Sequence, residues 1–288
     1  MMEKSKVFFT KEITSEAVLK LYDALEIELP GKVAVKVHSG EVGNQNFIRP
    51  SFWQPMIQKV NGTIVECNTA YEGARNTTKA HWETMKQHGW TDAAAVDILD
   101  EDGELELPIE NGKRIKKNFV GSHMENYDSM LVLSHFKGHP MGGFGGALKN
   151  ISIGLASSHG KLYIHGAGVP ENPWTSDHDS FLESMADAAQ SIVNYFPGKI
   201  AYINVMKNMS VDCDCCAVAE DPKMADIGIL ASLDPIALDQ ACVDFVYRSE
   251  DPGKKHLIER MESRNGIHTV EAAAELGFGN RAYELVRK

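Results

Sequence analysis

Hydrophobic and polar positions follow two alternating patterns along this chain of 288 residues. Short apolar runs predict buried strands, and longer stretches with apolar positions at helical spacing predict amphipathic helices. The expected strands are KVFFT, KVAVKVHS, GTIVECN, AAAVDIL, SMLVLSHF, KIAYINVM and DIGILAS. Because the two kinds of element alternate, we expect an α/β fold with a mixed or largely parallel sheet flanked by helices.

Capping residues mark where the helices begin and end. The expected helices are SEAVLKLYDALE after a Ser or Thr cap, KAHWETMKQHGW ending at Gly89, and DSFLESMADAAQSIVNYF stopped by Pro197 and Gly198. Another begins at DPIALDQACVDFVY, with Asp234 as its cap and Pro235 in the first turn. The C-terminal run ERMESRNGIHTVEAAAELGFGNRAYELV is expected to form two short helices separated by a glycine.

A polar, turn-rich stretch at residues 100–118 predicts a β-hairpin with Asn111 and Gly112 at its tip. It also divides the chain into an N-terminal α/β lobe, residues 1–118, and a C-terminal α/β lobe, residues 119–288. The second lobe carries a loop rich in histidine and glycine and a cluster of cysteines. We expect the functional site between the two lobes.

Charge and composition exclude several classes of protein. A formal net charge of -11 and a pI near 5.5 argue against binding to nucleic acid or to an anionic membrane surface, which require clustered basic residues. No stretch approaches the roughly 18 apolar residues of a membrane span, and the N-terminus MMEKSKVFFTKEIT lacks an apolar leader region. Five cysteines, three of them crowded together, do not resemble a secreted disulfide framework, so we expect a cytoplasmic protein with metal or redox chemistry.

The loop SHFKGHPMGGFGGALKN, residues 134–150, follows a predicted strand, where α/β sheets bind their ligands. His135 and His139 are candidate acid/base groups or metal ligands. A zinc-protease helix is excluded, because the Glu of H-E-x-x-H is missing and a glycine and a proline interrupt the segment. The glycines allow a ligand to approach closely and expose N–H groups for an anion, although they match no standard phosphate loop. A tight turn with ordinary surface histidines remains the alternative.

Cys213 and Cys215, in the sequence CDCC after KIAYINVM, can present two thiolates to one metal ion. Two ligands do not complete a site, and His135, His139 and His165 are the candidates to complete it. Cys67 and Cys242 are outside possibilities, and Cys242 is expected to face the core. Reduced, partly buried thiols without a metal remain the alternative. In the N-terminal half, polar groups follow two strands and are expected near the same loop: Lys36, His38, Glu41, Asn68, Arg75 and His81.

The segments HFKGHPMGGFGGALKN, GKLYIH, CDC and DIGILASLDPIALDQACVD resemble domain-of-unknown-function family 362, whose members are often described as uncharacterised iron-sulfur-centre proteins. The similarity runs from VKVHSGEVGN almost to the C-terminus. The most specific matches are His135, Lys137, His139, Gly145, Gly146, Lys149, Asn150, His165, Cys213, Asp214 and Cys215. Longer members carry a ferredoxin-like cysteine segment between the position of His165 and the C-D-C motif. This chain has only GAGVPENPWTSDHDS there, so it resembles a short member.

A second similarity is to the nickel-pincer lactate racemase family. His139, the glycine-rich turn ending in Lys149, and His165 have the order and similar spacing of a His, a Gly-rich turn, a Lys and a further His. This resemblance implies Lys149 as the residue to which a cofactor would be attached.

Together these patterns predict a metal- or iron-sulfur-centre protein with a redox-related activity. The metal is an iron-sulfur cluster or iron, with zinc or nickel as alternatives, held by Cys213, Cys215, His139 and His165. His135, His139 and Lys149 are expected in catalysis, and the expected cofactor-binding residues are Lys36, His38, Asn68, Arg75, Lys137, Gly143, Gly145, Gly146 and Asn150. The expected partner is a small anionic substrate or a redox partner protein. The alternatives are a racemase-like isomerase and a non-catalytic ligand-binding module with structural zinc.

Overall fold

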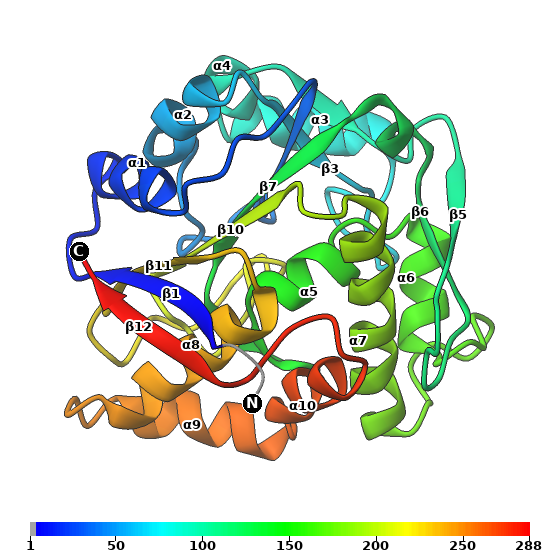
Figure 1. Cartoon of the computed structure of the whole chain (residues 1–288). Helices are drawn as coiled ribbons and strands as arrows, with labels where there is room; N and C mark the ends of the chain where they lie inside the picture. The colour runs from blue at the N-terminus through cyan, green and yellow to red at the C-terminus, as the bar shows by residue number, and fades with distance from the viewer. Residues whose placement is uncertain (1–3) are drawn as a thin grey trace.

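The computed structural model describes residues 4–288, so the first three residues of the N-terminal segment lie outside it. Its main strands are β1 (Ser5–Thr10), β2 (Val33–Lys36), β3 (Thr63–Glu66), β4 (Val96–Ile98), β7 (Ser129–His135), β10 (Ile200–Met206), β11 (Gly228–Ser232) and β12 (Tyr283–Arg287). They form one eight-stranded sheet in the order β12-β1-β11-β10-β7-β2-β3-β4 (Figure 1). Neighbours from β10 to β4 are parallel, and β11 runs antiparallel to both of its neighbours. The expected α/β fold with a mixed sheet is confirmed.

Helices cover both faces of the sheet. One face packs against the N-terminal helices α1 (Ser15–Ala24), α2 (Pro50–Lys59), α3 (Thr78–Gln87) and α4 (Trp90–Ala93). The other packs against α5 (Ala147–Ser152), α7 (His178–Tyr195), α8 (Pro235–Arg248), α9 (Lys254–Ser263) and α10 (Ile267–Glu275). In β7, Leu131 and Leu133 point into the first core, and Met130 and Val132 into the second. Burial on both faces explains why the strands read as continuous apolar runs. No helix within residues 4–288 is long and apolar enough to cross a membrane.

The predicted hairpin is present as β5 (Glu104–Pro108) and β6 (Lys117–Gly121), an antiparallel pair beside α6 (Ser158–His165). Asn111, in the connection, has the left-handed φ of 58° that turn residues adopt. A short 3-10 helix, η1 (Ser122–Asn126), leads from the hairpin into β7. β2 and β7 come from opposite sides of residue 118 and pair directly, so both segments contribute to one sheet. The division into two lobes stays a prediction.

The four capped helices appear where they were expected, as α1, α3, α7 and α8. Thr14 caps α1 and Asp234 caps α8 through their side-chain oxygens. Helices α9 and α10 are also present, but the C-terminal prediction was wrong at its end, where residues 283–287 form β12 beside β1. The segment with His135 and His139 was expected to be a loop at the end of a strand, and it contains a small ribbon, β8 (Lys137–His139) paired with β9 (Gly143–Gly145).

Candidate metal centre

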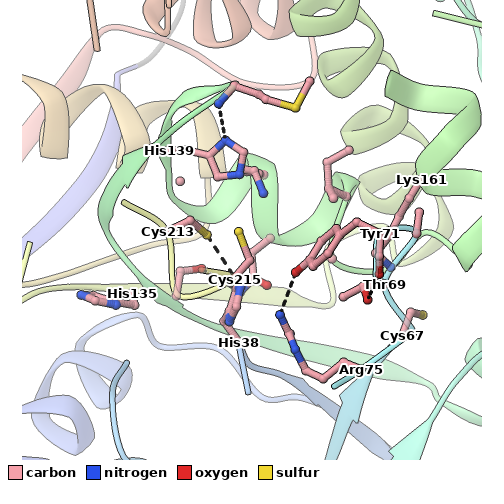
Figure 2. Close-up of a pocket in the computed structure, with 18 of the residues that line it drawn as sticks. His38, Cys67, Thr69, Tyr71, Arg75, His135, His139, Lys161, Cys213 and Cys215 are labelled. Atoms are coloured by element: carbon pink, nitrogen blue, oxygen red, sulfur yellow. Dashed lines mark hydrogen bonds between the residues drawn. The ribbon is translucent and has the colours of Figure 1, made fainter. Parts of the chain in front are cut away.

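A cavity of about 340 Å³ opens where β2, β3, β7 and β10 end, at the carboxyl edge of the parallel strands (Figure 2). This is the position at which open α/β sheets bind ligands. Most of the residues indicated by the sequence line it: Lys36, His38, Arg75, His135, Lys137, His139, Gly145, Gly146, Lys149, Asn150, His165, Cys213 and Cys215. Two others do not. Asn68 donates to the Thr78 hydroxyl, and Gly143 packs against Gly266.

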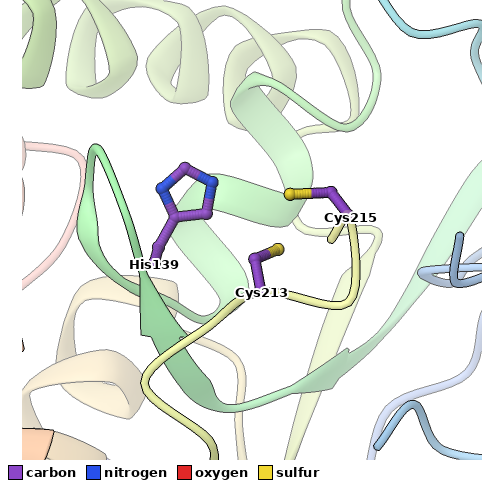
Figure 3. Close-up of side chains that lie close together, drawn as sticks. All are labelled: His139, Cys213 and Cys215. Carbon is purple, nitrogen blue, oxygen red and sulfur yellow. The ribbon is translucent and has the colours of Figure 1, made fainter. Parts of the chain in front are cut away.

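Three soft or borderline metal ligands converge at one wall of the cavity. The ligand atoms of His139, Cys213 and Cys215 all lie within 4.8 Å of one another (Figure 3). His139 and Cys213 are buried, and Cys215 is half-buried. The histidine ribbon and the cysteine loop, which are more than 70 residues apart in the sequence, therefore meet in space. The Cys/His cluster has the donor chemistry to hold a metal ion.

The remaining cysteines have other surroundings. Cys67 lines the cavity, but its thiol donates to the carbonyl of Leu155, and burial raises its pKa. Cys242 lies in α8, fully buried as expected, and accepts a hydrogen bond from Asn204. Cys216 is half-buried and lies outside the cavity lining. None of these three belongs to the ligand cluster within the described residues.

Asp214 fixes the cysteine loop from the side opposite the two thiols. Its carboxylate accepts from His135 Nδ1 at 2.9 Å and lies 3.0 Å from Lys137 Nζ, with all three side chains buried. Burial opposes ionisation of Asp214, but His135 and Lys137 outweigh it and lower its pKa. Successive residues thus point in opposite directions: the carboxylate faces the end of β7, and the flanking sulfurs face His139.

Backbone contacts complete this placement. Asn44 donates its side-chain N–H groups to the carbonyls of Cys213 and Cys216, at 3.5 and 2.8 Å. Gln45 donates to the carbonyl of Ala219, further along the same loop. Gly138 donates its N–H to Ser210, and a Cβ at this glycine would lie 2.3 Å from the carbonyl oxygen of Val211. Only glycine therefore lets the histidine ribbon come this close to the cysteine loop.

Two histidines face Cys213 in the same protonation state. Nδ1 of His139 accepts from the backbone N–H groups of Met141 and Gly142, at 3.1 and 2.8 Å. Burial, with a smaller contribution from Lys149, lowers the pKa of His139 to about 4, so the neutral ring carries its proton on Nε2. Nδ1 of His38 likewise accepts from Gly40, and its Nε2 lies 3.8 Å from the sulfur of Cys213. A metal bound through Nε2 of His139 must displace a proton.

The other two histidines have different partners. Both ring nitrogens of His135 contact oxygen acceptors, Asp214 on one side and the carbonyl of Lys207 at 2.5 Å on the other. His135 is not part of the three-residue cluster, and its role in completing the site stays a prediction. His165 donates from Nδ1 to the carbonyl of Lys161 and stacks on Phe181. It lines the cavity but is not part of the three-residue cluster.

The first N–H groups of α5, which follow the glycine-rich turn, are occupied within the protein. Ala147 and Leu148 donate to the buried carboxylate of Asp239, at 2.8 and 2.9 Å. A Cβ on Gly146 would lie 2.3 Å from the same carboxylate, so the carboxylate can come this close only to a glycine. Anion binding by the N–H groups of the glycines themselves stays a prediction.

Five cations line the cavity, and three of them have acidic partners. Lys36 is paired with Glu66 at 2.7 Å, Arg75 with Glu41 at 3.3 Å, and Lys137 with Asp214. Lys149 and Lys161 have no carboxylate within 4.0 Å among residues 4–288. The cavity therefore has more positive charge than its own acidic groups neutralise.

A comparison with models of protein families places most of the chain in one family. The model of the family described as "Domain of unknown function (DUF362)" matches residues 33–244. The chain belongs to this family. No curated protein matches the sequence.

Two solved structures resemble the DUF362 chain distantly. The lactate racemase apoprotein from Thermoanaerobacterium thermosaccharolyticum has 17% identity and a TM-score of 0.41, over 70% of this chain and 50% of that one. A protein from Thermotoga maritima has 10% identity and a TM-score of 0.44, over 92% of this chain and 59% of that one. The chain thus spans about half the length of the racemase. Neither likeness extends to function at this level of similarity.

The residues matched by the DUF362 model include the whole ligand cluster and its supports. Three supporting side chains were not predicted from the sequence: Asn44, Asp239 and Lys161. The run of amides Asn44, Gln45 and Asn46 after β2 was an available signal, because such side chains often bond to the backbone of a neighbouring loop. Asp239 lay inside a predicted helix and gave no comparable signal.

Proposed function

We propose that this protein is a metalloprotein in which Cys213, Cys215 and His139 hold one transition-metal ion at the wall of the cavity. The convergence of two sulfurs and an imidazole within 4.8 Å supports this proposal most directly. Thiolate and imidazole ligands suit iron, zinc and nickel, whereas magnesium and calcium prefer oxygen. A bound metal there would supply Lewis acidity or electron transfer.

The number of ligands favours an active centre over a structural one. A structural zinc site is closed by four protein ligands, whereas a catalytic site keeps a position free. Among the described residues, no fourth histidine, cysteine or carboxylate has a ligand atom within 4.8 Å of all three, although His38 Nε2 lies 3.8 Å from Cys213. The free position would face the cavity. We therefore favour a working metal centre over a ligand-binding module held together by structural zinc.

The charge of the cavity supports a small anionic substrate or the acidic group of a redox partner. Lys149 has no acidic partner within 4.0 Å in the described chain, and an anion that enters gains its attraction without displacing an existing ion pair. The five cysteines are all free thiols. Thiols persist in reducing compartments, which supports a cytoplasmic location and a redox-related activity.

Metal analysis of protein purified without oxygen tests the proposal. We expect about one metal ion per chain in the wild type and loss of most of it in Cys213→Ser and Cys215→Ser. Cys216→Ser is the matched control, because Cys216 is adjacent in sequence but outside the cluster, and it should keep its metal. A metal-free wild type, or equal metal loss in the Cys216 variant, contradicts the proposal.

The identity of the metal then separates the candidate activities. Iron with sulfide and a broad visible absorption band supports electron transfer, and iron alone supports a mononuclear redox centre. Zinc supports Lewis-acid chemistry. Nickel supports a racemase-like isomerase, for which Lys149 and His165 line the same cavity as His139.

A further inference from the structure

Lys161 is a buried lysine that the metal centre does not use. It lies in α6, lines the cavity, and is 6% exposed. Figure 2 shows it beside Thr69 and Tyr71, across the cavity from Cys213. The hydrogen-bond acceptor of its Nζ is the carbonyl oxygen of Ala156, at 2.5 Å. A carbonyl accepts equally from a neutral amine and from an ammonium group, so this contact does not require a charge.

The acidic groups nearest to Lys161 are already occupied. Glu66 forms an ion pair with Lys36 and accepts the backbone N–H of Ser39. Asp100 accepts the backbone N–H groups of Asn68 and Ser158 with its two oxygens. Neither carboxylate reaches within 4.0 Å of the Lys161 amine. Nothing in the described surroundings holds this lysine as an ammonium ion through a direct ion pair.

Neighbouring cations further oppose a charge on Lys161. Lys36 and Arg75 line the same cavity and are each paired with a carboxylate, and the positive charge of Arg75 opposes a charge on Lys161. Burial, and to a lesser extent Arg75, lowers the pKa of Lys161. Desolvation and a neighbouring cation are the conditions under which a lysine amine becomes a nucleophile.

We propose that Lys161 is a nucleophilic amine that forms an imine with a small carbonyl compound in the cavity. The nitrogen lone pair attacks the carbonyl carbon, the C=O π electrons move to oxygen, and oxygen takes up a proton while nitrogen loses one. The resulting carbinolamine releases water and forms the C=N bond, so an amine and a carbonyl give an imine and one water molecule.

Lys149 narrows the class of substrate. Its amine is half-buried, lines the same cavity and has no hydrogen-bond or ion-pair partner in the described chain. Lys149 and Lys161 both contribute to the electrostatic environment of His165, which places them at the same end of the cavity. A small molecule whose carboxylate is held by Lys149 and whose adjacent carbonyl carbon lies at Lys161 is a 2-oxo acid.

Reductive trapping tests this inference without an assay of activity. The intact protein is incubated with pyruvate and cyanoborohydride at pH 7, and modified lysines are located by peptide mass spectrometry. Each unit by which a lysine pKa is lowered raises its neutral fraction about tenfold at this pH. We expect Lys161 to be labelled at least about tenfold faster than Lys79, which is exposed. Labelling of Lys161 no faster than Lys79 overturns the inference.

Variants separate the two lysines and the metal centre. Lys149→Met should slow the labelling of Lys161 by pyruvate but not by propanal, which has no carboxylate. If the substitution changes the labelling rate by the same factor for both probes, the assignment of a 2-oxo acid is overturned. Lys161→Arg removes the nucleophilic amine. Circular dichroism should show that this variant is folded, and imine trapping in α6 should be lost; trapping in α6 that continues in the folded variant overturns the assignment to Lys161. Labelling of Lys161 should persist in Cys213→Ser, so that failure of the metal proposal leaves this result intact. If folded Cys213→Ser protein is no longer labelled at Lys161, the amine does not act independently of the metal centre, and the inference is overturned.

Discussion

Replacing Asp214 with asparagine removes the only carboxylate that contacts both His135 and Lys137 in the described structure. The carboxylate is 1% exposed, and the side chains of His135 and Lys137 are 3% and 5% exposed, so water cannot replace the lost charge. Removing one partner of a buried ion pair costs about 3–5 kcal/mol. Because the amide oxygen of asparagine still accepts one hydrogen bond, we expect a loss of about 3 kcal/mol in the free energy of unfolding at pH 7.

The dependence on pH gives this prediction a second test. The folded-state pKa of Asp214 lies below its unfolded value of about 3.9, because His135 and Lys137 outweigh the effect of burial. Its contribution to stability is therefore complete above that value and is lost as the pH falls towards the folded-state pKa. The difference between wild type and Asp214→Asn should be largest at neutral pH and should shrink below about pH 4.

Urea unfolding of chelator-treated protein measures this effect without a contribution from bound metal. Asp92→Asn makes the same chemical change at an exposed position and should change stability by less than about 0.5 kcal/mol. A loss below about 1 kcal/mol for Asp214→Asn at pH 7 would refute the argument that this carboxylate holds the cysteine loop in place.

Three further predictions follow from other contacts. Gly146→Ala places a Cβ 2.3 Å from Asp239 and should cost about 1–3 kcal/mol in urea unfolding, whereas Gly145→Ala meets nothing closer than 3.7 Å and should be nearly neutral; equal losses would contradict this. Asn44→Asp removes the N–H donors that hold the cysteine loop and should weaken metal binding about 10- to 100-fold in competition with a chelator, and unchanged affinity would count against the clamp. Burial lowers the pKa of His165 to about 4 in the folded protein. The contribution of His165 to the free energy of unfolding should therefore be complete above its unfolded pKa of about 6.5 and fall by about 3 kcal/mol as the pH drops to 4. A folded His165→Leu variant whose free energy of unfolding depends on pH as steeply as that of the wild type would disprove this.

The strands and most helices were predictable because their signals are local. Continuous apolar runs in segments such as SMLVLSHF, and caps such as Asp234, depend on neighbours within one turn or one strand. The position of the candidate site was also predictable, since His139 and the C-D-C motif both follow strands of the parallel part of the sheet. Strand β12 was missed because its pairing with β1 joins the two ends of the described chain.

The parts of the site that were not predictable depend on contacts between distant segments. Asp239 accepts the N–H groups of Ala147 and Leu148 from a helix more than 90 residues away, so these two groups of α5 are not available to an anion. The protonation of His139 is set by the backbone of the ribbon that folds around it. Similarly, the lack of an acidic partner for Lys161 becomes visible only when Glu66 and Asp100 are seen bonded to other groups.

X-ray absorption spectroscopy at the edge of the bound metal tests the central claim most directly, because it counts the ligand atoms. We expect two sulfur neighbours, at about 2.3 Å for zinc, and at least one nitrogen neighbour at about 2.0 Å. In Cys215→Ser the sulfur contribution should fall to one neighbour or the metal should be lost. A metal surrounded by four protein sulfurs, or one with no sulfur neighbour at all, would contradict a centre built from Cys213, Cys215 and His139.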